Sequence, residues 1–104
     1  MRKEISVCVD FPDYGIVEVS AKYELTALVN TNEDSSFRCE LETFFTKGDT
    51  GMDHREFTFL ITRHSGRNSS AVKLLTASMR HGQNQEHLVN TLSSYIILNE
   101  LEKH

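Results

Sequence analysis

The sequence predicts an α+β domain in which a four-stranded antiparallel meander, over residues 4–64, is followed by two C-terminal helices packed on one face. Three observations carry this prediction. Apolar and polar residues alternate with a period of two through most of the first half. Short polar segments separate the alternating runs. The apolar spacing then becomes helical after about residue 68. A chain of 104 residues has room for one core, so residues 1–104 are expected to form a single domain.

The first two strands are the clearest. Residues 5–11 alternate apolar and polar side chains, and the segment 12–15 contains Pro, Asp and Gly, which favour a turn. The run from Val17 to Val29 is the longest alternation in the chain, with Leu28 as its exception. A strand of this kind packs one face on a core and leaves the other in water.

Two further strands follow with the same pattern. Phe37 to Phe45 forms the third, in which Phe44 breaks the alternation, and residues 57–62 form the fourth. Polar turns are expected at residues 30–35 and 47–51. Four consecutive strands with such short connections predict a meander.

Two helices are expected to cover the apolar face of this sheet. Val72, Leu75 and Met79 follow helical spacing, with Ser69 or Ser70 as N-cap and Gly82 at the end. Apolar residues between 88 and 101 predict a second helix, which Asn84 could cap. Residues 95–98 are also compatible with a short strand, because β-branched and aromatic residues cluster there. The helix is preferred because the segment is long and lacks Gly and Pro.

The charge distribution excludes some partners. The formal net charge is −4, with −6 on residues 1–53 and +2 on residues 54–104. The solvent-facing side of the sheet is expected to be acidic and to repel phosphates, so duplex nucleic acid is not a predicted partner. The N-terminus is charged and no apolar run approaches a membrane span. With only two cysteines, a reduced, cytoplasmic setting is expected.

One loop has the composition of a ligand site. Arg63, His64, Arg67 and Ser69 lie close together in the segment 63–70, which is expected to lead into a helix N-terminus. Free N–H groups and arginines there would favour a phosphate or carboxylate. An ordinary solvated connection has the same composition, and this alternative carries more weight.

The solvent-facing side of the sheet is the second candidate surface. Leu28, Phe44 and Leu60 interrupt its polar pattern, and Glu40 and Glu42 would form an acidic rim. Exposed apolar groups mark contact sites, so these residues are candidates for protein contact. Cover by a second layer of the same chain is an equal alternative.

No catalytic residues, metal ligands or cofactor are predicted. The five histidines lack metal-ligand spacing along the chain. Cys8 is expected on the polar face of the first strand and Cys39 among buried apolar residues, so neither is expected to be a nucleophile.

Residues 23–46, above all Phe37-Arg38-Cys39-Glu40-Leu41 after a long amphipathic strand, resemble the central hairpin of SecB-type export chaperones. The resemblance covers under a quarter of the chain, and the proline-rich second half of that family is not evident in a chain with one proline. It implies a holdase chaperone as one form of protein binding.

These features together predict a small non-enzymatic protein-binding module, such as an inhibitor, immunity-type or adaptor protein. A second copy of the chain is one possible partner, because strand edges can pair. A small-ligand or phosphate-binding protein using the 63–70 loop, and a SecB-like holdase, are the alternatives.

Overall fold

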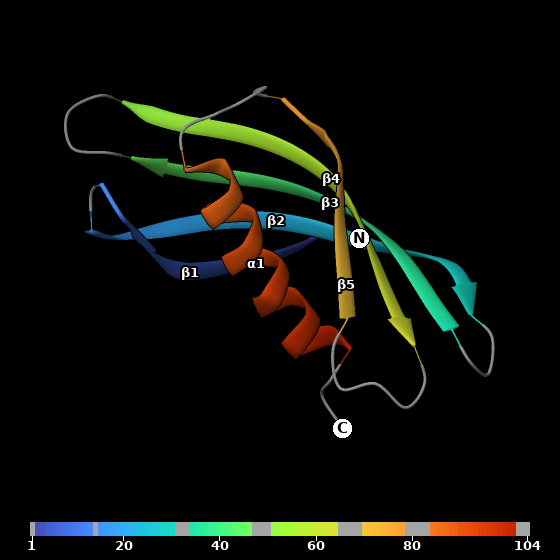
Figure 1. Cartoon of the computed structure of the whole chain (residues 1–104). Helices are drawn as coiled ribbons and strands as arrows, with labels where there is room; N and C mark the ends of the chain where they lie inside the picture. The colour runs from blue at the N-terminus through green and yellow to red at the C-terminus, as the bar shows by residue number, and fades with distance from the viewer. Residues whose placement is uncertain are drawn as a thin grey trace.

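The computed structural model describes residues 2–13, 15–30, 34–46, 51–64, 70–78 and 84–101, without the side chains of residues 29 and 30. The chain forms five strands and then one helix (Figure 1). These elements are β1 (Lys3–Phe11), β2 (Gly15–Asn30), β3 (Asp34–Thr46), β4 (Met52–His64), β5 (Ser70–Ala77) and α1 (Gln85–Glu100).

The five strands form one antiparallel sheet in the order β1-β2-β3-β4-β5, so each strand pairs with its neighbour in the sequence. The α+β class and the meander over the first half are as predicted. The prediction of four strands and two helices is wrong, because residues 70–77 form a fifth strand along β4. A single helix follows it among the described residues.

Two β-bulges interrupt the ladders. Between β2 and β3, Ala27 pairs with Phe37 and Val29 with Ser36, so Leu28 has no residue opposite it. Between β4 and β5, Phe59 pairs with Leu74 and Thr58 with Thr76, which leaves Leu75 without one. A bulge adds one residue to one strand and so shifts the alternation of side chains between the faces.

The core lies between one face of the sheet and α1. Fully buried strand residues include Val9, Val19, Leu41 and Phe59, and α1 contributes the buried side chains of Leu88, Val89, Leu92, Ser93, Ile96 and Ile97. Residues 95–98 belong to α1, so the helix predicted there, and not the alternative strand, is confirmed. Asn84 is the N-cap residue, as expected, but it has a positive φ of 59° and makes no side-chain cap.

Polar contacts fix both ends of α1 on the sheet. Near its C-terminal end, the Tyr23 hydroxyl donates to Glu100 Oε1 at 2.6 Å, and an Arg63 N–H donates to the Leu101 carbonyl. Burial and this contact with Glu100 raise the pKa of Tyr23. Near its N-terminal end, Asn84 Nδ2 lies 3.4 Å from Asp13 Oδ2.

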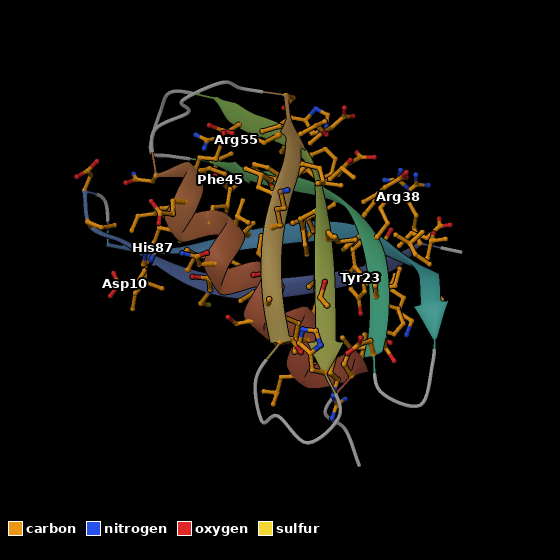
Figure 2. The ribbon with its side chains drawn as sticks, turned by 45° about the vertical axis from the view of Figure 1, so that its right-hand side comes forward. Asp10, Tyr23, Arg38, Phe45, Arg55 and His87 are labelled. Atoms are coloured by element: carbon orange, nitrogen blue, oxygen red, sulfur yellow. The ribbon has the colours of Figure 1, made fainter. Side chains whose placement is uncertain are left out.

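One charged side chain is buried among the apolar residues of this face. Arg55 is only 2% exposed, and its guanidinium donates two hydrogen bonds to Asp53, at 2.9 and 3.2 Å. It also lies 5.7 Å from the centre of the Phe45 ring, and Figure 2 shows both side chains beside the first turns of α1. A buried charge needs such partners, because its desolvation is costly.

The molecule is elongated, with extents of 49 × 25 × 23 Å. The long dimension reflects strands of up to 16 residues. Within the described part of the chain, no helix has the length and apolar character needed to cross a membrane.

Candidate functional site

The strand β5 lies at one edge of the sheet. Its inner edge pairs with β4, and none of the described strands lies along its other edge. At the opposite end of the sheet is β1, the strand to which α1 lies closest. The strands β5 and β1 therefore form the two edges of the sheet, and α1 packs most closely on the β1 side.

This position leaves β5 exposed. Unlike the other four strands, it contains no fully buried residue. Val72, Leu74 and Leu75 are 38%, 40% and 47% exposed, and they lie within four consecutive positions of one strand. Val72 and Leu74 pair with the buried Ile61 and Phe59, so they extend the apolar face of the core to the edge of the sheet. We call residues 70–77, with their open backbone edge, the β5 edge.

The face of the sheet opposite α1 is the second surface; we call it the outer face. Its charged side chains pair with one another. Arg2 Nη1 lies 2.5 Å from Glu42 Oε1 and Arg2 Nη2 lies 3.6 Å from Glu40 Oε2, while Arg38 is 3.7 Å from Glu40. The carboxylates predicted to form an acidic rim thus already have cationic neighbours, which lowers the net charge they present to a partner.

The apolar residues predicted for protein contact are exposed or half-buried, but they are spread over the sheet. Leu28 is a bulge residue of β2 and is 51% exposed. Leu60 lies opposite Arg38, whereas Phe44 is six residues further along β3. That spacing corresponds to roughly 20 Å along a strand. Leu60 and Phe44 are therefore separated by the charged row of residues 38, 40 and 42.

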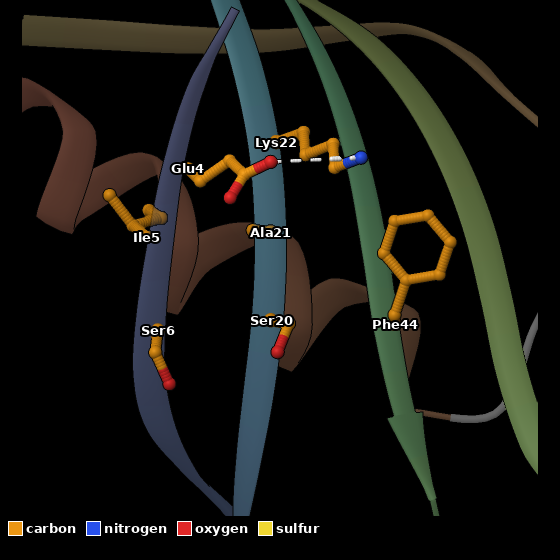
Figure 3. A pocket seen from close by; sticks show the side chains of 7 residues that line it. All are labelled: Glu4, Ile5, Ser6, Ser20, Ala21, Lys22 and Phe44. Carbon is orange, nitrogen blue, oxygen red and sulfur yellow. Dashed lines mark ion pairs between the residues drawn. The ribbon is translucent and has the colours of Figure 1, made fainter.

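A shallow hollow lies on the outer face beside Phe44. It has a volume of about 320 Å³, with the Phe44 ring at one side and the Lys22–Glu4 ion pair, 3.7 Å long, at the other (Figure 3). Serines and small side chains of β1 and β2 form its floor: Ser6, Ser20 and Ala21. None of the residues that line the hollow has a buried polar atom without a hydrogen-bond partner. The lining therefore does not indicate a particular class of ligand.

Most of the predicted anion loop, over residues 65–69, lies outside the described residues. The chain after it forms β5 and not the expected helix, so β5 does not supply the helix N-terminus on which the prediction depended. Arg63 is bound to the Leu101 carbonyl, and His64 Nδ1 lies 2.5 Å from Asp34 Oδ1. Arg67 and Ser69 lie outside the described residues.

The two cysteines lie where the alternation predicted. Both are free thiols, with Cys8 exposed and Cys39 buried. Burial, together with the charge of Glu40, raises the pKa of the Cys39 thiol to about 12. A thiol of that pKa is neutral at physiological pH, whereas the thiolate is the reactive form of cysteine.

One arrangement on the outer face could not be read from spacing along the chain. Glu42 of β3 lies opposite Glu56 of β4, and His54 lies two residues before Glu56 on the same face. Metal-ligating atoms of these three side chains all lie within 4.8 Å of one another. The pairing register of β3 and β4 brings them together, so only the register could have revealed them.

Comparison with known proteins identifies no relative. No family model matches the chain, and neither a curated protein nor a solved structure matches it. Any functional assignment therefore depends on the surfaces described above.

Proposed function

We propose that this chain is a non-enzymatic protein-binding module that takes an extended segment of a protein partner alongside the β5 edge. The observation that carries the proposal is the exposure of Val72, Leu74 and Leu75 on a strand whose second edge meets no described strand. Soluble proteins usually protect such edges with charges, prolines or covering segments. This strand carries one charged residue, Lys73, and no proline.

Strand addition suits both features of this edge. The backbone of a partner strand can hydrogen-bond to β5, which provides affinity with little dependence on sequence. Val72 and Leu74 would contact alternate side chains of that strand, which provides selectivity for apolar residues. Lys73 lies on the other face of β5 and favours an acidic residue in the partner.

The test compares two matched variants in a binding measurement. Val72→Thr/Leu74→Thr removes the apolar contacts and keeps β-branched residues that favour a strand. Leu98→Gln is the control, because Leu98 is an exposed apolar residue (61%) that belongs to α1 and not to β5. A partner is first isolated by affinity capture from host lysate and then purified, and its affinity for each variant is measured.

The proposal requires a one-to-one complex that the β5 variant weakens at least tenfold and the Leu98 variant leaves unchanged. Slower hydrogen exchange of the β5 amides in the complex is also expected, because added hydrogen bonds protect them. Equal binding by both variants would refute it. So would a dimer of the chain that dissociates on β5 substitution, or indiscriminate binding of unfolded proteins as a holdase would show.

A further inference from the structure

Three side chains that commonly bind metals converge on the outer face, near the end of the β3–β4 hairpin. His54 Nε2 lies 3.4 Å from Glu42 Oε2 and 4.0 Å from Glu56 Oε1. All three ligating atoms fit within 4.8 Å of one another. The cluster combines one imidazole nitrogen with two carboxylate oxygens, a mixed donor set of the kind that binds zinc.

The distances fit a metal ion at the centre of the three atoms. Zinc bonds to nitrogen and oxygen are about 2.0–2.2 Å, so two ligands of a tetrahedral ion lie about 3.4 Å apart. The His54–Glu42 distance already has this value. His54 Nε2 and Glu56 Oε1 are 4.0 Å apart, so the Glu56 carboxylate must move closer to complete the site, and its side chain is 61% exposed.

Neighbouring residues hold two of the ligands in position. The Phe44 ring stacks on the His54 imidazole, with centroids 4.6 Å apart and planes 6° from parallel. Arg2 binds Oε1 of Glu42, while Oε2 is the oxygen nearest His54. These contacts restrict the orientation of the His54 ring and of the Glu42 carboxylate.

The pairing register also places two like charges directly opposite each other. Glu42 and Glu56 face each other across β3 and β4, an arrangement that destabilises a sheet unless a cation lies between them. Arg2 offsets part of this repulsion from Oε1 of Glu42, whereas Oε2, the oxygen nearest His54, is directed at the cluster.

We propose that Glu42, His54 and Glu56 form a surface site for a divalent transition-metal ion, for which Zn²⁺ fits best. The imidazole nitrogen disfavours Mg²⁺ and Ca²⁺, which prefer oxygen ligands alone. The fourth ligand is water, because His54 and Glu56 are both exposed. A bound ion would link β3 to β4 and offset the repulsion between the two carboxylates. This site is independent of the β5 edge.

The test is calorimetric titration of the purified chain with ZnCl₂ at neutral pH, with MgCl₂ and CaCl₂ as comparison ions. One Zn²⁺ per chain is expected, with no comparable binding of the other two. His54→Ala and Glu56→Gln should each weaken Zn²⁺ at least about tenfold, since even contacts that only orient ligands change affinity 10–100-fold.

His64→Ala is the matched control. His64 is also a partly exposed imidazole beside a carboxylate, Asp34, but the described residues supply no third ligand there. Its Zn²⁺ affinity should equal that of the unaltered chain. A shift of the His54 Nε2 resonance on Zn²⁺ addition gives a direct readout, and circular dichroism confirms that each variant folds.

Three results would overturn the proposal. They are the absence of one-to-one Zn²⁺ binding, unchanged affinity in His54→Ala, and equal weakening by His64→Ala. Failure of this site would leave the β5 proposal untouched, because the β5 variants retain Glu42, His54 and Glu56.

Discussion

At the scale of single residues, the position of a residue in the apolar–polar alternation decides whether its side chain is exposed or buried. Cys8 and Cys39 are chemically identical, yet one is exposed and the other lies in the core, because they occupy opposite faces of their strands. The sequence pattern alone was enough to predict both positions. It could not predict that Arg55 is buried, since that depends on the Asp53 and Phe45 contacts made on folding.

We expect the Cys39 thiol to make the protein less stable in alkali. Its pKa rises from the ordinary value of 9.0 to about 12 in the folded protein. Below pH 9 both states hold the proton and the thiol has no effect on the pH dependence. Between pH 9 and 12 the unfolded chain loses the proton first, so the free energy of unfolding falls with rising pH, by at most about 1.4 kcal/mol per pH unit.

Urea denaturation at pH 8, 9 and 10 checks this expectation. The decline should be shallower in Cys39→Ala than in the unaltered chain, whereas Cys8→Ala, at an exposed position, should follow the unaltered chain. Comparing slopes separates this effect from the contribution of Tyr23, whose raised pKa acts in the same direction in every variant. Parallel curves for all three proteins would contradict the interpretation.

At the scale of elements, the bulges explain where the sequence pattern misled. Leu28, the exception in the alternation of the second strand, is the bulge residue of β2. Leu75 is the bulge residue of β5, and this extra residue interrupts the period of two, so that Val72 and Leu75 have a spacing that also fits a helix. Met79 lies outside the described residues. Residues 70–77 form a strand because they pair with the open edge of β4, an interaction that local spacing does not contain.

The helix α1 was predictable because its apolar stripe is long, and its two faces differ sharply in exposure. Leu92 is fully buried, whereas Leu98 is 61% exposed. Leu92→Ala should lower the free energy of unfolding by about 2–5 kcal/mol, through lost burial and the cavity left behind. Leu98→Ala should change it by no more than about 0.5 kcal/mol. Chemical denaturation of both variants measures the difference, and similar losses would show that α1 packs by another face.

At the scale of the whole molecule, the sheet and the helix share one core, so we expect them to unfold together. Far-ultraviolet circular dichroism should report loss of α1 and the sheet, and tyrosine fluorescence should report loss of the Tyr23 environment against Glu100. The two urea transitions should coincide, as in other small single domains. Earlier loss of the helical signal would mean that the sheet is stable without its cover.

The candidate sites were less predictable than the fold, because each depends on which strands become neighbours. The outer-face residues Phe44 and Leu60 were identified from alternation, but their separation follows from the register of β3 and β4. The β5 edge required knowledge that residues 70–77 form a strand. The Glu42–His54–Glu56 cluster depends on the same register, which brings side chains of the two strands within 4.8 Å of one another.

The order of the elements along the chain has a consequence for synthesis. All five strands precede α1, so a ribosome releases the complete sheet before the helix that covers its apolar face. Each strand can pair with its predecessor as it emerges, because the meander contains only neighbouring connections. Until α1 covers them, Phe11, Leu41 and Phe59 on the apolar face of the sheet lack their cover, and transiently exposed apolar surface of this kind promotes aggregation.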